Sequence, residues 1–150
     1  MRPPAATPWL EDGLANWPAQ DDRVLVRNGT IRLQWCHGAP GMVTALGDTL
    51  EEDLALAGGE LTWRAGPLVK GASLCHGTAG NGYAFLTLFA RTGDERWLTR
   101  ARAFAMSAIE QVERARSTNG RYAFSLWSGD LGTAVYLADC LQGGGAIPLP

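Results

Sequence analysis

Three short glycine-containing segments recur along this chain, and they limit the folds open to it more than any other feature. They are WCHGAPGM at 35–42, LCHGTAGN at 74–81 and LWSGDLGT at 126–133. Each contains Gly-x-x-Gly, and the first glycines, Gly38, Gly77 and Gly129, are 39 and 52 residues apart, enough for two helices between loops. Such repeats bury their apolar faces only against neighbouring repeats, so the pattern predicts stacked helical hairpins in an open solenoid or a closed ring. Three units are too few to close a ring.

The rest of the sequence predicts an all-α body, because no segment shows the strict apolar-polar alternation of a half-buried strand. The clearest helix spans 94–114, where apolar residues recur every three or four positions and Asp94 is placed to cap the amino end. Further predicted helices span 49–63, 81–90 and 131–141. Gly58 and Gly59 weaken the first of these by roughly 1 kcal/mol each relative to alanine.

The first thirty residues have a different character from the rest. They hold four prolines, two tryptophans and the turn-forming pair Asn28-Gly29. We therefore expect residues 1–30 to form an irregular Pro-rich arm and residues 31–150 to form the helical body. We also expect the open edge of this body at the first repeat to expose apolar helix faces.

Composition restricts the partners and the compartment. The formal net charge is −2 and the Lys and Arg residues are scattered, which argues against a nucleic acid or an anionic membrane surface as partner. There is no apolar run of about 18 residues and no apolar region at the start, so we expect no membrane span and a cytoplasmic location. Three cysteines, an odd number, favour metal binding or catalysis over disulfides in a reducing compartment.

Cys36, Cys75 and His76 stand at the starts of the first two repeats. Two cysteines and one histidine are favoured zinc ligands, and they would leave one position of a tetrahedral zinc open, as catalytic sites require. Repeat symmetry would bring the two loops together, and Gly77 and Gly80 would let the backbone turn sharply. Spacing alone leaves a second interpretation open, in which the cysteines are small core residues at helix starts.

The strings WCHGAPG, KGASLCHGTAGNGYAFL and SLWSGDLGTAVYLADCL, in this order, resemble the carboxy-terminal half of LanC-like (lanthionine synthetase C) proteins. The resemblance covers residues 31–141 and leaves the arm without a counterpart. It implies an α/α toroid of seven helical hairpins, of which the last two to three are present. It also implies a zinc ion held by Cys36, Cys75 and His76.

The implied reaction is addition of a cysteine thiol to dehydroalanine or dehydrobutyrine, forming a thioether. The thiol would come from a peptide cysteine or glutathione, and the acceptor would be a dehydrated peptide or protein. Direct coordination to zinc removes the proton of a thiol and so produces the nucleophile. The enolate formed by attack then needs a nearby general acid.

Four further residues are candidates for catalysis or substrate binding, and the three basic ones also have a simpler explanation. His37 is a candidate general acid or a partner of the adjacent Cys36. Arg32, four residues before Cys36, matches a catalytic arginine of the lanthipeptide cyclases. Lys70 and Arg116 resemble positions that bind the glutathione carboxylates in eukaryotic members. Solvated surface charges would explain all three basic residues equally well.

Two other features have structural explanations. An acidic cluster, formed by Asp48, Glu51, Glu52 and Asp53, could suggest a glycosidase pair, but a solvated first helical turn is favoured because it complements the helix dipole. Cys140 lies in an apolar helical stretch and is expected to be a buried thiol.

The chain departs from the family pattern in its length. Family members are more than twice as long, and their catalysis also uses an Asp and a His-Gly motif from earlier repeats, for which this chain has no counterpart. The alternative to an active enzyme is therefore a truncated, non-catalytic zinc-binding protein, or a subunit completed by another chain that supplies the missing repeats.

Overall fold

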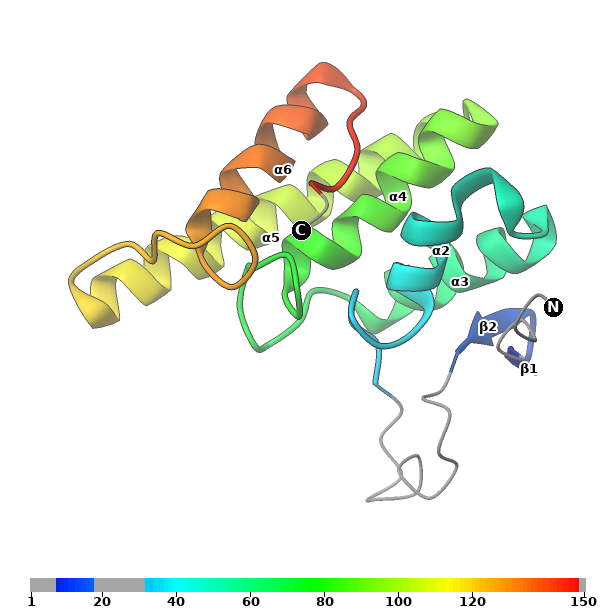
Figure 1. The fold of residues 1–150 in the computed structure, drawn as a ribbon, viewed down its shortest axis with the longest axis horizontal. Helices are drawn as coiled ribbons and strands as arrows, with labels where there is room; N and C mark the ends of the chain where they lie inside the picture. Colours follow the sequence, from blue (N-terminus) through cyan, green and yellow to red (C-terminus); the bar gives the residue numbers. More distant parts are fainter. Residues whose placement is uncertain (1–7, 18–31, 149–150) are drawn as a thin grey trace, which may run out of the picture.

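The computed structural model describes residues 8–17 and 32–148 of the 150-residue chain. These ranges contain five α-helices, one short 3-10 helix and one two-stranded sheet (Figure 1). The elements in chain order are β1 (Trp9–Glu11), β2 (Leu14–Asn16), α2 (Ala39–Leu46), η1 (Gly47–Thr49), α3 (Glu52–Ala65), α4 (Thr78–Thr92), α5 (Glu95–Asn119) and α6 (Asp130–Gln142). The prediction of an all-α body is confirmed. No helix within the described ranges is long and apolar enough to cross a membrane.

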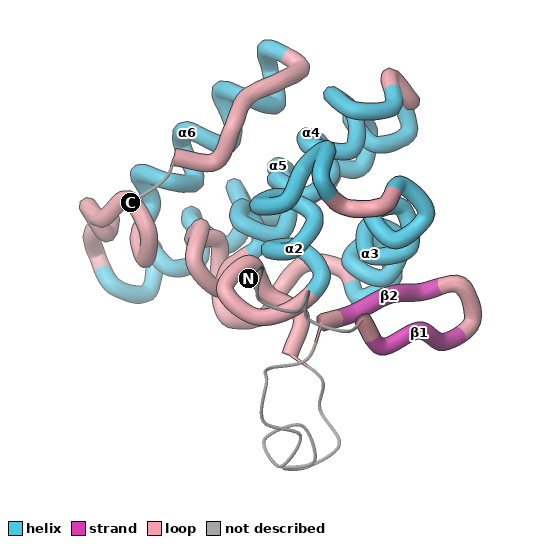
Figure 2. The backbone as a smooth tube through the Cα atoms, turned by 45° about the vertical axis from the view of Figure 1, so that its right-hand side comes forward, coloured by secondary structure: helices cyan, strands magenta, loops and turns pink. Residues whose placement is uncertain are grey.

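The helices stack as successive pairs. α2 packs against α3 and α4 packs against α5, and α6 follows as a single helix (Figures 1 and 2). The helices α2, α4 and α6 each begin at the residue after the first glycine of one of the three segments, and α4 contacts both of the others. This arrangement is the stack of hairpins that the repeats predicted, with two complete pairs and the first helix of a third.

The core surrounds α4, whose residues from Thr78 to Leu86 are all buried. Phe85 of this helix packs edge-on against Phe104 of α5, with ring centroids 4.8 Å apart, and stacks on Trp97 at 6.1 Å. Gly59 of α3 allows close approach here, because a Cβ at this position would overlap Leu88 and lie 2.9 Å from the Trp97 ring. The glycine that weakens α3 as an isolated helix is therefore required by its packing against α4 and α5.

The predicted helix over 94–114 begins as expected and ends later. The Asp94 carboxylate accepts the N–H of Arg96 at 2.9 Å, which confirms the predicted cap. α5 continues to Asn119, where Gly120 adopts the left-handed conformation with φ 70°. The last turns are exposed and polar, so no apolar periodicity in the sequence marks them. As a result Arg116, which lies beyond the predicted end of the helix at residue 114, is in the last turn of α5.

Residues 9–16 form a β-hairpin where the sequence predicted an irregular arm. β1 and β2 pair antiparallel through a two-residue turn in which Asp12 and Gly13 both have positive φ, 50° and 74°. This is the Asp-Gly turn that suits the twist of a hairpin. The rest of the predicted arm, residues 1–7 and 18–30, lies outside the described residues.

The hairpin is attached to the first repeat through Asn16 and Trp17, which are both buried. The side-chain oxygen of Asn16 accepts the N–H of Ala39 at 2.8 Å and that of Trp17 at 3.0 Å. Ala39 is the first residue of α2, so Asn16 satisfies a helix N–H from 23 residues away. The Trp17 ring lies against Gly58 of α3.

Apolar exposure is concentrated at the other end of the stack from the one expected. β2 packs on α3, which covers part of the first repeat (Figure 2). The first pair of helices exposes Leu46 and Trp63, and more large apolar side chains are exposed on α5, on α6 and on the loop between them. The latter are Met106, Ile109, Phe124, Leu131, Val135 and Leu141. The prediction of an apolar edge at the first repeat is therefore wrong for the part covered by the hairpin.

Candidate metal centre

The loops of the three repeats are joined through their backbones at equivalent positions. The N–H of Cys36 donates to the carbonyl of Cys75 at 3.2 Å, and the N–H of Cys75 donates to the carbonyl of Trp127 at 2.9 Å. Each of these residues stands two positions before the first glycine of its repeat. The structure thus confirms that repeat symmetry brings the two cysteine loops side by side.

The second glycine of each Gly-x-x-Gly segment is required for space. A Cβ on it would overlap the carbonyl oxygen of the residue six positions earlier. The pairs are Gly41 with Trp35, Gly80 with Leu74, and Gly132 with Leu126. The loop therefore folds closely back over the first turn of the following helix. Gly77 was predicted to supply conformational freedom, but its φ of −124° is one that any residue can adopt. A Cβ on Gly77 would overlap the backbone of Ser73, so glycine is required there for space.

The two cysteines of the adjoining loops are free thiols in different surroundings. Cys36 is exposed and Cys75 is half-buried. The pKa of the Cys75 thiol is raised above its ordinary value, first by burial and then by the neighbouring Cys36. The loop geometry thus brings the two thiols close enough to interact.

The sulfur of Cys36 has two nitrogen neighbours. The Nδ1 atom of His37 lies 3.2 Å from Sγ, and the amide Nε2 of Gln34 donates to Sγ at 3.3 Å. Gln34 and His37 are also paired through their backbones, with N–H to carbonyl bonds of 3.0 and 2.9 Å, so the segment forms a tight turn. His37 is thus next to the sulfur of Cys36, as its predicted role as a partner of that cysteine requires. Gln34 was not predicted, since no motif marks it.

The predicted ligand set is only partly assembled. His76 is half-buried and adjacent in sequence to Cys75. Within residues 8–17 and 32–148, however, no group of three or more His, Cys, Asp or Glu side chains is gathered as a metal site. The donor types fit zinc, since thiolates and imidazole are its preferred ligands, and the two thiols are already neighbours.

The predicted basic residues lie at different places. Arg32 is exposed, and its backbone carbonyl accepts the side-chain amide of Asn16 at 3.4 Å. Lys70 donates from Nζ to the Oε1 atom of Gln34 at 3.2 Å, which links it to the surroundings of Cys36.

Arg116 lies on the exposed end of α5. Its Nη1 atom lies 3.3 Å from Oε2 of Glu113, and its guanidinium carbon lies over the Tyr122 ring, 5.1 Å from the ring centroid. The structure therefore brings Lys70, but not Arg116, to the network of contacts around Cys36.

The two remaining predictions hold. The acidic cluster is exposed, with Glu52 and Asp53 in the first turn of α3, and Glu52 lies 3.7 Å from Arg91. Cys140 is 3% exposed, and burial raises the pKa of its thiol to about 11.

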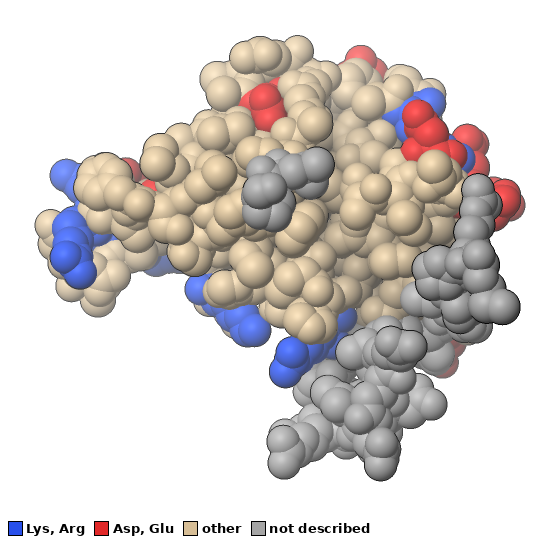
Figure 3. Space-filling view, in the orientation of Figure 1, with Lys and Arg blue, Asp and Glu red and all other residues tan. Residues whose placement is uncertain are grey.

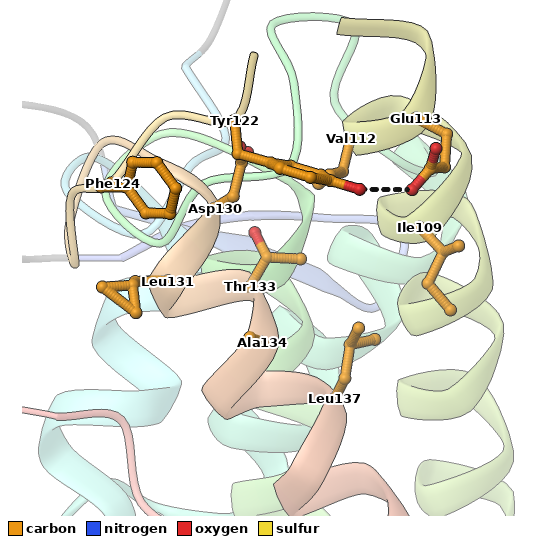
Figure 4. Close-up of a pocket in the computed structure, with 10 residues that line it drawn as sticks. All are labelled: Ile109, Val112, Glu113, Tyr122, Phe124, Asp130, Leu131, Thr133, Ala134 and Leu137. Carbon is orange, nitrogen blue, oxygen red and sulfur yellow. Dashed lines mark hydrogen bonds between the residues drawn. The ribbon is translucent and has the colours of Figure 1, made fainter. Parts of the chain in front are cut away.

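An open concavity lies between α5 and α6, and no residue of the two cysteine loops lines it. This apolar pocket has a volume of about 310 Å³ (Figure 4). Its lining residues include Ile109, Tyr122, Leu131 and Leu137, and none of the predicted site residues is among them. On the face seen in Figure 3, charged side chains are few, and most of them lie near the edge of the view.

These features define a helical-hairpin repeat protein that presents a pair of cysteines from equivalent loops. The chain belongs to the lanthionine synthetase C-like family, since the profile described as "Lanthionine synthetase C-like protein" matches residues 9–146. The match confirms the resemblance and extends it beyond 31–141. It includes the β-hairpin, for which the sequence suggested no counterpart.

Curated relatives support the same assignment. The chain is 41% identical over 120 residues to a protein of Danio rerio named glutathione S-transferase LANCL1, an alignment that covers 75% of this chain and 29% of that protein. It is 38% identical over 109 residues to LanC-like protein GCL1 of Arabidopsis thaliana, covering 65% of this chain and 25% of that protein. The chain thus spans less than a third of the length of these relatives.

Proposed function

We propose that the chain forms the zinc-binding part of a LanC-like protein that promotes addition of a thiol to dehydroalanine or dehydrobutyrine in a peptide or protein. The observation that supports it most directly is the backbone bond between Cys36 and Cys75, which holds two thiols on neighbouring loops. Glutathione is a candidate thiol donor, because the relative from Danio rerio is named a glutathione S-transferase. The thioether product would form at the β-carbon of the dehydrated residue.

Cys36, Cys75 and His76 would hold the zinc ion. When bound, zinc would keep a substrate thiol in its thiolate form. His37, exposed beside Cys36, is the proposed proton donor to the α-carbon, and its contact with Sγ fixes its position. Arg32 is exposed at the start of the same loop and is proposed to stabilise the negative charge that develops during addition.

Two basic residues are proposed to bind the carboxylates of glutathione. Lys70 is exposed, and an ammonium group has three donors, so it can bind a carboxylate while it donates to Gln34. Arg116 is paired with Glu113, and binding a substrate carboxylate there would require that pair to open. Lys70 therefore has the stronger geometric support of the two.

Catalysis by the whole protein is proposed to need further repeats. The chain covers 29% and 25% of the two curated relatives named above, and apolar side chains of α5 and α6 are exposed. A chain supplying the missing hairpins would complete the cavity. The alternative is a zinc-binding protein without catalytic activity. Three free cysteines suit a reducing compartment, and we propose the cytoplasm.

Zinc content tests the proposal at its first step. Protein purified without chelator should contain one zinc ion per chain by elemental analysis, and Cys36→Ala or Cys75→Ala should abolish it. Cys140→Ala is the matched control, because that thiol is buried elsewhere, and it should retain zinc. A wild-type protein that folds and holds no zinc would rule the site out.

Activity is tested separately. The zinc-loaded chain is incubated with glutathione and a dehydroalanine peptide, and the adduct is measured by mass spectrometry against the uncatalysed rate. A rate above background that is lost in Cys75→Ala supports the enzyme and shows that this chain suffices for the reaction. Bound zinc without any acceleration is expected if catalysis needs the further repeats. The non-catalytic alternative is favoured if a full-length relative with all repeats, assayed in the same way, is active while this chain is not.

A further inference from the structure

The surroundings of Cys36 contain a chain of contacts to which no function has yet been given. Gln34 is 7% exposed and lies two residues before Cys36. Its Oε1 accepts from Lys70 at 3.2 Å, and its Nε2 donates to Cys36 Sγ at 3.3 Å. One buried amide therefore connects a lysine ammonium to a cysteine sulfur.

The direction of this chain is fixed by its ends. An ammonium group can only donate, so the amide oxygen must face Lys70. The amide NH₂ then faces the sulfur, which must accept. A thiolate accepts such a bond better than a thiol, because hydrogen bonds to an ionised partner are the stronger ones. The positive charge of Lys70 polarises the amide in the same sense.

The backbone of Gln34 has a second role in the same loop. Its N–H and carbonyl are both bonded to His37, which closes the turn around Cys36. The side chain and the main chain of one residue thus fix the position of Cys36 from two sides. A buried amide with both polar ends used is more than packing requires.

We propose that Gln34 is a positioning residue that orients Cys36 for metal binding, and that Lys70 acts on Cys36 through it. The proposal rests on the zinc site proposed above, of which Cys36 is a ligand. Partners that orient metal ligands by hydrogen bonds commonly contribute 10- to 100-fold to metal affinity. Lys70 gains a role here that is independent of carboxylate binding.

The contact itself is tested on the metal-free chain. Side-chain amide signals of ¹⁵N-labelled protein are recorded by NMR, with the Gln34 pair assigned by its loss in Gln34→Leu. Cys36→Ala and Lys70→Met should each shift the Gln34 amide, while that of Gln142, exposed at the end of α6, stays in place. An amide of Gln34 that does not move in Cys36→Ala overturns the proposal, whether or not zinc binds.

Zinc affinity, measured by chelator competition, tests the effect on the site. Gln34→Leu keeps the approximate size but removes both polar ends of the side chain, so affinity should fall roughly 10- to 100-fold. Gln142→Leu makes the same change on the surface and should leave affinity unchanged. Equal affinities in Gln34→Leu and the wild type, with both thermal midpoints preserved, would overturn the proposal.

A double-mutant cycle tests whether Lys70 acts through Gln34. Lys70→Met should weaken zinc binding in the wild type and have no further effect in Gln34→Leu. An equal effect in both backgrounds would refute the link between the two residues. A wild-type chain without zinc would instead refute the zinc site, and the NMR result would still decide the contact.

Discussion

Cys36 and Cys75 are bonded through their main chains, with the N–H of the first donating to the carbonyl of the second at 3.2 Å. This bond joins two positions 39 residues apart that are equivalent in the repeat. Cys75 makes the same bond to Trp127 of the third repeat, at 2.9 Å. The cysteines are therefore neighbours because the repeats stack in register, and the third repeat has a tryptophan where the others have a thiol.

The register depends on the second glycine of each segment, and Gly80 provides the test. A Cβ in Gly80→Ala would overlap the carbonyl oxygen of Leu74, next to Cys75. The free energy of unfolding should fall by about 1–3 kcal/mol, because the backbone must shift. Gly144→Ala is the control, since a Cβ there meets no atom within 4 Å. Urea unfolding checks both, and equal stabilities for the two variants would contradict the close approach.

Local patterns in the sequence predict most of the helical body. The cap at Asp94 and the apolar periodicity that follows it are determined within a few residues, and the structure confirms them. The sequence also predicts that Cys36 and Cys75 lie close together, because stacked repeats bring equivalent loops together.

Other features depend on contacts between distant segments. Asn16 attaches the hairpin to the first repeat because its side chain accepts a hydrogen bond from Ala39. Gln34 belongs to the surroundings of the cysteine because its amide lies between Lys70 and Cys36. Nothing in their immediate sequence marks either role. The hairpin carried one local signal, the Asp12-Gly13 pair, which the prolines around it obscured.

The attachment of the hairpin is tested at Asn16. Asn16→Ala leaves the N–H groups of Ala39 and Trp17 buried without this acceptor. An unsatisfied buried polar group costs about 1–3 kcal/mol, so the unfolding free energy should fall by at least that amount. Asn119→Ala, at the exposed end of α5, is the control and should change stability by less than about 0.5 kcal/mol. A similar small effect at both positions would show that the hairpin contributes little to the first repeat.

Alanine substitutions at the two adjacent glycines of α3, Gly58 and Gly59, are expected to differ in their effect on stability. In Gly59→Ala, overlap with Leu88 and Trp97 should outweigh the gain of about 1 kcal/mol in helix propensity, so the protein is destabilised by roughly 1–3 kcal/mol. In Gly58→Ala the new Cβ would lie 3.0 Å from Val43 Cγ2 and 3.3 Å from the Trp17 ring, so small movements of these two side chains suffice. Thermal unfolding should therefore show Gly58→Ala above Gly59→Ala in midpoint, and the reverse order would contradict the packing described here.

The buried thiol of Cys140 is expected to make the folded protein less stable at alkaline pH. Burial raises the pKa of its thiol from 9.0 to about 11, so the folded protein retains a proton that the unfolded chain releases. The contribution of the protonated Cys140 thiol to the free energy of unfolding is complete below about pH 9 and is lost as the pH rises toward about 11.

Between about pH 8 and pH 10.5, the unfolding free energy of the wild type should therefore fall more steeply than that of Cys140→Ala. Burial is the largest cause of the raised pKa values of Tyr83 and Tyr136, and Cys140 contributes to both shifts, so the two proteins share only the part of the slope that burial of the tyrosines produces. The difference between the two slopes in urea unfolding therefore measures the thiol together with its coupling to the tyrosines. Parallel slopes would show that Cys140 titrates alike in the folded and unfolded chains.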